Sequence, residues 1–324
     1  QYPPGVALWG SLFYAFDTST ERQTVEWGDE ENGGITEIDV PAIAPAAVAA
    51  VVATTIAMLF LAFTLFELTD RRTALAATVV AALGTGAWSI ASNMLWQHSP
   101  GIMCISIGVY LAARNRFALS GLAFAGAILI RPHTALIAAA IGLTVAIRRR
   151  TARPLLSMGL TSAIGLTLVL GYNAIVWDEL TISGGYGSGF SERVQNPSML
   201  DLLERVIAVM FDPRVGVAIT SPFILVAMIG IVMLRNRPST TPDWALGAAL
   251  GGAAYMLVQL QANRVSGGHG FFGYRYPLEA LMAAAPLLVL GAQAFISRGN
   301  VGRKILLLTA VASVVMHGYG AITT

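Results

Sequence analysis

The sequence predicts an all-α, polytopic membrane protein built as a bundle of transmembrane helices. Of its 324 residues, 55% are hydrophobic and only 12% are charged, whereas soluble domains carry about 25% charged residues. The apolar residues form repeated long runs that short polar stretches separate. The basic residues lie in small clusters between these runs instead of on one patch, and the net charge is only +2, so we expect no nucleic-acid partner.

Residues 1–40 precede the first long apolar run. Gln1–Phe16 is a Tyr-Pro-Pro-Gly turn followed by an apolar segment that is too short to span a bilayer, because a span needs about 20 residues. We expect this segment to form a helix lying in the membrane interface on the outer side. Asp17–Asp39 is acidic and contains Gly-rich breakers, which predicts an exposed loop.

Ten candidate spans follow, and a long loop separates the sixth from the seventh. Within that loop, Asp178–Arg214, apolar residues recur at helical spacing over Met199–Phe211, which predicts a second interfacial helix. Residues 1–324 therefore form a single membrane domain, with its spans in 41–177 and 215–324. The predicted spans are Pro41–Leu68, Thr73–Trp96, Ile102–Ala113, Phe117–Ile130, Thr134–Ile147, Leu155–Trp177, Val215–Leu234, Trp244–Leu260, Pro277–Ile296 and Ile305–Thr323.

The basic clusters predict how the spans are oriented. If every candidate span crosses, all five clusters fall on one side, which the excess of Lys and Arg in cytoplasmic loops identifies as the cytoplasmic side. The chemistry-capable residues then face outwards, in what we expect to be the cytoplasmic membrane of a bacterium or archaeon. The clusters are Arg71 and Arg72; Arg114 and Arg116; Arg148, Arg149, Arg150 and Arg153; Arg235 and Arg237; and Arg298, Arg303 and Lys304.

The polar break Ser266–Glu279 is the main candidate for a binding site. Arg275 stands there between Tyr274 and Tyr276, among glycines and further aromatics. A guanidinium is planar and always charged, so it suits a phosphate. The competing interpretation is a Gly-rich turn with aromatic residues and a snorkelling arginine at the membrane interface.

Four more residues on the same predicted side are weaker candidates. His98 follows the end of a span and is able to donate to a phosphate or a sugar hydroxyl, although an ordinary interfacial histidine explains it equally well. Arg131 and His133 interrupt two short spans, where charges are costly and usually functional or paired. Glu279 lies one turn into its span, where it is able to orient Arg275 or favour the helix N-terminus. No His–carboxylate pair at helical spacing indicates a metal site.

Four segments together resemble the GT-C-type glycosyltransferases, in their order along the chain. These are YPPG (Tyr2–Gly5), LWQHSPG (Leu95–Gly101), FDPRVGVAITSP (Phe211–Pro222) and GGHGFFGYRYPLEALMAAAP (Gly267–Pro286). The chain is similar to the polyprenyl-phosphate-dependent branch, which includes the protein O-mannosyltransferases and the lipid A aminoarabinose transferase.

This resemblance implies transfer of a sugar from a polyprenyl-phosphate donor to an acceptor outside the cell, which is a cell-envelope glycan, a lipid or a protein. Lipid-linked sugars carry their own activation energy, as a reaction on a face without ATP requires. No cofactor is certain, and a divalent cation is compatible with the resemblance. The residues that the resemblance and the chemistry assign to the donor phosphate and sugar are Arg275, Tyr274, Tyr276, His98, Arg131, His133, Tyr2 and Glu279.

The catalytic residue is not identified. Members of this family place an aspartate in the first outer loop shortly before the Pro-Pro turn, where it acts as a general base or orients the acceptor. Here that position lies upstream of Gln1, so we expect the natural chain to have a further N-terminal segment. Asp17, Glu26, Asp29 and Glu30 are weak substitutes, since they also fit a solvated acidic loop.

A transporter or flippase of a lipid-linked substrate is the alternative function. Such a protein also presents arginines and aromatics to a lipid phosphate. It is expected to show ionisable residues near the bilayer midplane and internal repeats, and this sequence shows no evident repeat.

Overall fold

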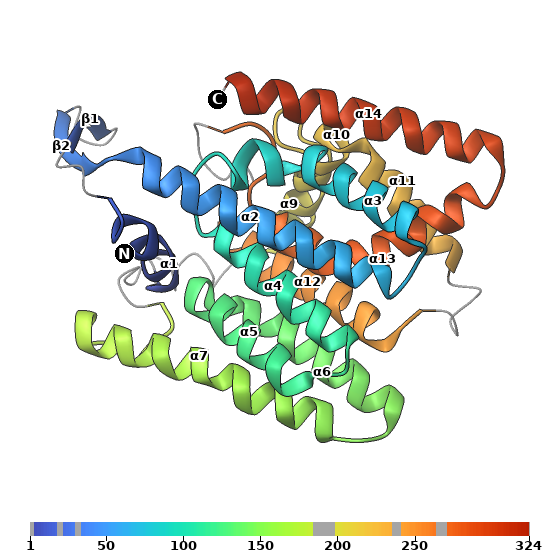
Figure 1. Cartoon of the computed structure of the whole chain (residues 1–324), viewed down its shortest axis with the longest axis horizontal. Helices are drawn as coiled ribbons and strands as arrows, with labels where there is room; N and C mark the ends of the chain where they lie inside the picture. Colours follow the sequence, from blue (N-terminus) through green and yellow to red (C-terminus); the bar gives the residue numbers. More distant parts are fainter. Residues whose placement is uncertain are drawn as a thin grey trace.

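The chain folds into a bundle of helices with one two-stranded hairpin beside it (Figure 1). The computed structural model describes residues 3–17, 22–29, 34–183, 198–234, 241–263 and 271–323. The elements are α1 (Gly5–Tyr14), β1 (Arg22–Asp29), β2 (Gly34–Pro41), α2 (Ile43–Phe66), α3 (Arg71–Leu83), the π-helical turn η1 (Ala87–Ala91), α4 (His98–Ala113), α5 (Phe117–Ile130), the 3-10 turn η2 (Pro132–Thr134), α6 (Ala135–Arg149), α7 (Arg153–Trp177), α9 (Met199–Phe211), α10 (Val217–Thr220), α11 (Pro222–Leu234), α12 (Asp243–Ala262), α13 (Leu278–Ile296) and α14 (Asn300–Thr323).

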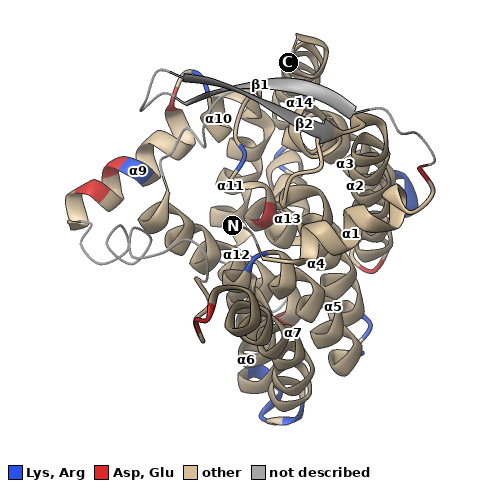
Figure 2. Cartoon of the chain, turned by 90° about the vertical axis from the view of Figure 1, so that its left-hand side faces the viewer, with Lys and Arg blue, Asp and Glu red and all other residues tan. Residues whose placement is uncertain are grey.

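Five of these helices are long and apolar enough to cross a membrane: α2, α7, α12, α13 and α14. The prediction of a helical, integral membrane protein is therefore confirmed. The number of ten crossings stays a prediction, because α4, α5 and α11 have 16, 14 and 13 residues, fewer than the roughly 20 that a bilayer needs. In Figure 2, which views the bundle from the left-hand end of Figure 1, most of the ribbon carries no charged residue.

The predicted acidic loop is wrong over most of its length, because β1 and β2 pair there as an antiparallel hairpin. The register runs from Arg22 opposite Pro41 to Asp29 opposite Gly34. Two features of the sequence explain this. β2 is rich in β-branched residues, and β1 contains Thr24, Val25 and Trp27; β-branched and aromatic residues favour extended backbone. An Asn-Gly pair stands between the strands, and it is a strong hairpin signal. The connecting residues 30–33 lie outside the described part of the chain.

Two predicted spans are broken helices. The run Thr73–Trp96 divides into α3, which ends before Gly84, and the π-helical η1. The run Val215–Leu234 divides at Ser221 into α10 and α11, because a proline at position 222 disfavours helical backbone in the residue before it. The predicted helix Met199–Phe211 is confirmed as α9. It begins with a capping box formed by Ser198 and Asp201. Its position at a membrane interface stays a prediction.

Four of the five predicted basic clusters lie toward one end of the bundle, which we call the basic end, and the fifth, Arg235 and Arg237, lies outside the described residues. Arg114 Nη1 lies 2.7 Å from Glu67 Oε1, and Arg149 pairs with Asp243 while donating to Asn115 at 2.6 Å. These contacts join the ends of α2, α4 and α6 to the start of α12. Figure 1 shows the α2–α3, α6–α7 and α13–α14 connections toward the same, right-hand end.

Candidate functional site

A cluster of buried polar side chains lies at the other end of the bundle. We call it the Arg131 cluster and define it as His98, Arg131, Tyr255, Gln259 and Glu279. The start of α4, the α5–η2 junction, the end of α12 and the start of α13 bring these residues together. Each is at most 6% exposed, and Glu279 is fully buried. Burial of ionisable groups is costly unless they are paired and hydrogen-bonded, and here they are.

The hydrogen bonds assign the proton on His98. Its Nδ1 lies 2.9 and 3.0 Å from the two oxygens of Glu279, and its Nε2 lies 3.2 Å from Arg131 Nη2. A guanidinium has only donors, so Nε2 accepts and Nδ1 carries the hydrogen that it donates to Glu279. His98 is therefore neutral. Arg131 Nε also lies 3.4 Å from Glu279 Oε1, so the cluster holds one positive and one negative charge that compensate each other.

Arg131 is occupied by partners from within the protein. Its Nε donates to Gln97 Oε1 at 2.9 Å, and its Nη1 donates to the Tyr255 hydroxyl at 2.8 Å and to Gln259 Oε1 at 3.5 Å. The ring of Tyr276 covers the guanidinium at 5.7 Å. Because its donors are engaged on all sides, Arg131 holds together four segments of the chain and has little left to offer to a ligand.

Arg275 has the opposite environment. Its guanidinium carbon lies 4.5, 5.0 and 5.1 Å from the ring centres of Trp96, Phe271 and Tyr276. Its one hydrogen bond within the described residues is a long one of 3.3 Å from Nη2 to the Tyr276 hydroxyl, and its buried Nε has no partner there. No carboxylate in the described ranges pairs with it. Among the described residues, Arg275 is thus a partly buried cation without a carboxylate partner, held in an aromatic cage.

His133 extends the Arg131 cluster toward the outside. Its ring stacks on Tyr255 at 4.6 Å, and its Nε2 donates to Gln259 Oε1 at 2.7 Å. It stands in η2, between two helices. Burial, followed by the nearby charge of Arg131, lowers the pKa of His133 to about 4. The side chain is consequently neutral at neutral pH.

Tyr274 belongs to a different cluster from Arg275. Its hydroxyl lies 2.9 Å from Ser221 Oγ, which also lies 2.9 Å from His317 Nε2. His317 Nδ1 in turn lies 2.8 Å from Ser89 Oγ. We call these four residues the His317 cluster. The hydrogen bonds of this cluster connect α14 to η1, to the α10–α11 junction and to the segment that carries Arg275. Tyr274 therefore holds that segment in place and does not contribute its hydroxyl to the surroundings of the Arg275 guanidinium.

The segments that carry the family resemblance meet around these two clusters. A Cβ added at Gly5 would lie 2.7 Å from Ile130 Cγ1, one residue before Arg131, and a Cβ added at Gly101 would lie 3.3 Å from Glu279 Oε1. Ser221, from the third segment, bonds to Tyr274 in the fourth. Glycine at positions 5 and 101 permits the close approach that this arrangement requires.

The remaining sequence candidates do not join the described site. Tyr2 and Glu30 lie outside the described residues, as do the side chains of Glu26 and Asp29 in β1. Asp17 follows α1, where its N–H bonds to the Tyr14 carbonyl at 3.1 Å. Within the described ranges no three His, Cys, Asp or Glu side chains are grouped to hold a metal ion, so a cation requirement stays a prediction.

Three further residues contact the site although their sequence context did not single them out: Gln97, Tyr255 and Gln259. A signal for two of them exists, because Tyr255 and Gln259 stand four residues apart in an apolar run and therefore share a face of the helix. Comparison with protein-family models, curated proteins and solved structures gave no match. Any assignment of function accordingly rests on the residues themselves.

Proposed function

We propose that this protein is a membrane glycosyltransferase of the GT-C type. It would take a sugar from a polyprenyl-phosphate donor and transfer it, with inversion expected from the family, to a glycan, lipid or protein acceptor on the outer face of the membrane. The observation that carries this proposal is Arg275, a cation without a carboxylate partner among the described residues, held between Trp96, Phe271 and Tyr276.

The chemistry of the leaving group explains the role of Arg275. When the sugar departs, negative charge grows on the lipid phosphate, and a fixed donor aimed at that charge lowers the barrier. The Nε–H of Arg275 has no hydrogen-bond partner in the described part of the chain, and Nη2 donates only a long bond to the Tyr276 hydroxyl there. The charges of Arg131 and Glu279 compensate each other. In this proposal these two residues and His98 have a structural role beneath the phosphate site.

Transport of a lipid-linked substrate is the second candidate, and one observation favours it. His98, Arg131 and Glu279 form a buried ionisable cluster within a helical bundle, and such clusters commonly mark substrate or proton paths in transporters. The two functions differ in their product. A transferase releases free polyprenyl phosphate, whereas a flippase moves the intact lipid to the other leaflet.

The proposal is tested in proteoliposomes that contain the full chain and polyprenyl-phosphate-linked hexoses with a radiolabelled sugar. We expect label to move to an acceptor membrane extract with release of polyprenyl phosphate. A second readout is the amount of polyprenyl phosphate that stays bound to the protein. Arg275→Gln should lower this amount by about tenfold or more, because hydrogen bonds to charged groups contribute roughly 1.5–3 kcal/mol. Arg275→Lys should recover only part of it, since an ammonium lacks the planar fork.

Arg116→Gln is the matched control, because Arg116 is an exposed arginine in the α4–α5 connection at the basic end, whereas Arg275 precedes α13. Equal retention of polyprenyl phosphate by wild type and Arg275→Gln would contradict the proposed phosphate site. Movement of intact labelled lipid between leaflets without any release of polyprenyl phosphate would favour the transporter.

A further inference from the structure

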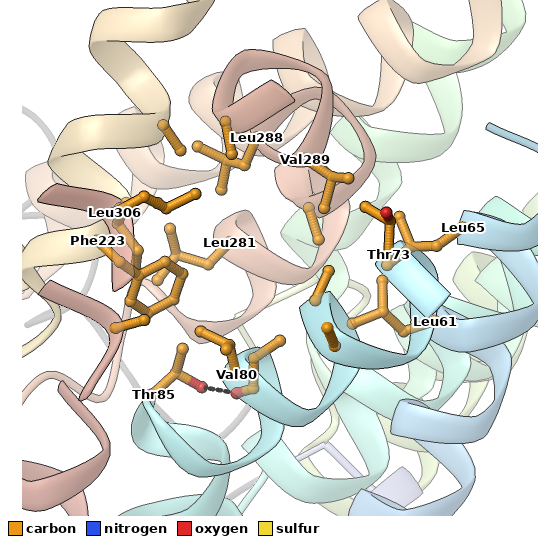
Figure 3. A pocket seen from close by; sticks show the side chains of 18 of the residues that line it. Leu61, Leu65, Thr73, Val80, Thr85, Phe223, Leu281, Leu288, Val289 and Leu306 are labelled. Atoms are coloured by element: carbon orange, nitrogen blue, oxygen red, sulfur yellow. Dashed lines mark hydrogen bonds between the residues drawn. The ribbon is translucent and has the colours of Figure 1, made fainter. Parts of the chain in front are cut away.

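An apolar cavity opens between α2, α3, α11, α13 and α14 (Figure 3). Its volume is about 330 Å³, and its lining follows α13 from Leu278 to Ile296. At 1.5 Å per residue, the lining of α13 extends over roughly 27 Å, nearly the full depth of a bilayer core of about 30 Å. Side chains such as Leu61, Val80, Phe223 and Leu281 form its walls.

The polar groups of this cavity are distributed unevenly. Thr73, Gln293 and Arg303 lie at the basic end, whereas Thr85, toward the other end, donates its hydroxyl to the Ala81 carbonyl at 2.6 Å. Thr73 donates to Asp70 at 2.6 Å and Gln293 to Thr69 at 2.5 Å. Arg303 is exposed and has no ion-pair partner in the described part of the chain. It is therefore a donor available to a ligand among the cavity-lining residues at this mouth.

Positive charge is in excess around the same mouth. The connections on either side of it carry additional cations, and the two nearby acids are already engaged: Asp70 caps α3, and Glu67 pairs with Arg114. The cations are Arg71, Arg72, Arg298 and Lys304. A ligand that fits has a long apolar body and an anionic head at the basic end.

The surroundings of the cavity indicate that this ligand comes from the membrane. Apolar side chains on the helices that border it are exposed on the outer surface: Leu75 and Val79 of α3 are 45% and 54% exposed, and Leu308 and Val311 of α14 are 69% and 53% exposed. Such a surface is stable in lipid and costly in water. A lipid chain reaches the cavity laterally, and a chain spanning one leaflet needs about 15 Å of it.

We propose that the cavity binds an anionic phospholipid, with one acyl chain along α13 and the phosphate at Arg303. This site is separate from the polyprenyl-phosphate site proposed above, because Arg275 precedes α13 and Arg303 follows it. The lipid joins α14 to the α2–α3 pair across a space that protein side chains leave open. It does not depend on the function proposed for Arg275.

The experiment measures how much lipid the purified full chain retains in detergent, by native mass spectrometry. The probes are dioleoyl phosphatidylglycerol, dioleoyl phosphatidylcholine and a polyprenyl phosphate. We expect wild type to retain the glycerol lipid in preference to the choline lipid. Arg303→Gln should lower its retention about tenfold, the effect of one lost charge-assisted contact. Leu281→Trp, which fills the cavity, should lower the retention of both phospholipids.

Arg116→Gln is the control, because Arg116 is an exposed arginine in a different connection at the basic end. Retention that is equal in wild type, Arg303→Gln and Arg116→Gln would overturn the site, and so would an equal loss in both variants, which would indicate general charge attraction. Unchanged retention by Leu281→Trp would overturn the placement of the acyl chain. If Arg303→Gln lowers the retention of polyprenyl phosphate and not that of the phospholipid, the cavity binds the polyprenyl lipid instead of a phospholipid.

Discussion

At the scale of single residues, the partners of each arginine decide its role. Arg131 and Arg275 carry the same guanidinium and stand near the same end of the bundle, yet Arg131 donates to four side chains and Arg275 to one. The first is compensated by Glu279, whereas the second has no carboxylate partner among the described residues. Hence we expect structural consequences from changing Arg131 or Glu279, and binding consequences from changing Arg275.

The buried pair predicts a large loss of stability in Glu279→Gln. This change leaves the Arg131 charge buried without compensation, which typically costs about 3–5 kcal/mol. Glu67→Gln is the control, because it removes the carboxylate of a half-exposed pair with Arg114 and should cost less than about 1 kcal/mol. Thermal unfolding in detergent, compared across the three proteins, measures both effects. Similar unfolding temperatures for the two variants would contradict the compensating role of Glu279.

His133 predicts a loss of stability in mild acid. Its pKa is about 4 in the folded protein and about 6.5 when unfolded. Between these values the unfolded chain binds a proton that the folded chain does not, so stability falls as the pH drops through this window, by at most about 1.4 kcal/mol per pH unit. Above the unfolded pKa the contribution is constant.

The matched variant is His133→Gln, which cannot titrate and retains a side-chain amide for Gln259. Unfolding of both proteins is followed between about pH 7 and pH 4.5, a range that covers the ordinary titration of histidine. The stability of wild type relative to the variant should decrease as the pH falls. A difference that does not change with pH would contradict a lowered pKa of His133 in the folded protein.

At the scale of elements, glycines determine how closely the helices pack. Gly230 of α11 faces Gly291 of α13 backbone to backbone, and Gly165 of α7 faces Ala125 of α5 in the same way. Small residues allow such close approach, and the van der Waals packing that results contributes to helix association in membranes. Other residues of α11 and α13 line the apolar cavity, so a change in the spacing of these two helices would also affect the cavity.

Gly230→Ala should destabilise the protein by about 1–3 kcal/mol, because the added methyl meets the Gly291 carbonyl and forces the helices apart. Gly159→Ala in α7 is the control, since a Cβ there has no neighbour within 4 Å, and alanine is the better helix former. Unfolding temperatures in detergent should fall for the first variant and not for the second. A tolerated Gly230→Ala would mean that these two helices are free to separate.

At the scale of the whole molecule, the two ends of the bundle carry different groups of polar residues. Arg114, Arg149 and their partners occupy the basic end, and the Arg131 cluster occupies the other. This separation is what alternating crossings predict from the sequence, and it agrees with a cytoplasmic basic end.

Cysteine labelling in intact cells tests this orientation. In a Cys104→Ser background, Leu200→Cys places a thiol on α9, where Leu200 is 72% exposed, and Arg116→Cys places one in an exposed position at the basic end. A membrane-impermeant maleimide should label the first directly and the second only after permeabilisation. The reverse result would invert the topology and put the Arg275 site inside the cell.

The sequence by itself determined the helical membrane class, the helix over Met199–Phe211 and the gathering of His98, Arg131, His133, Arg275 and Glu279 at one end. Local information suffices for these, because hydrophobic runs and loop charges report directly on membrane partition. It did not determine the hairpin, because its turn and its β-branched residues lie within an acidic stretch that also fits a loop.

Only the tertiary structure decided the partners of each group. It separated Tyr274 from Arg275, assigned the proton on His98, added Tyr255 and Gln259 to the Arg131 cluster, and revealed the cavity along α13. The physical reason is that the compensation of a charge, and a space between helices, depend on segments far apart in the chain. Arg131 and Glu279 stand 148 positions apart in the sequence, and their pairing follows from packing alone.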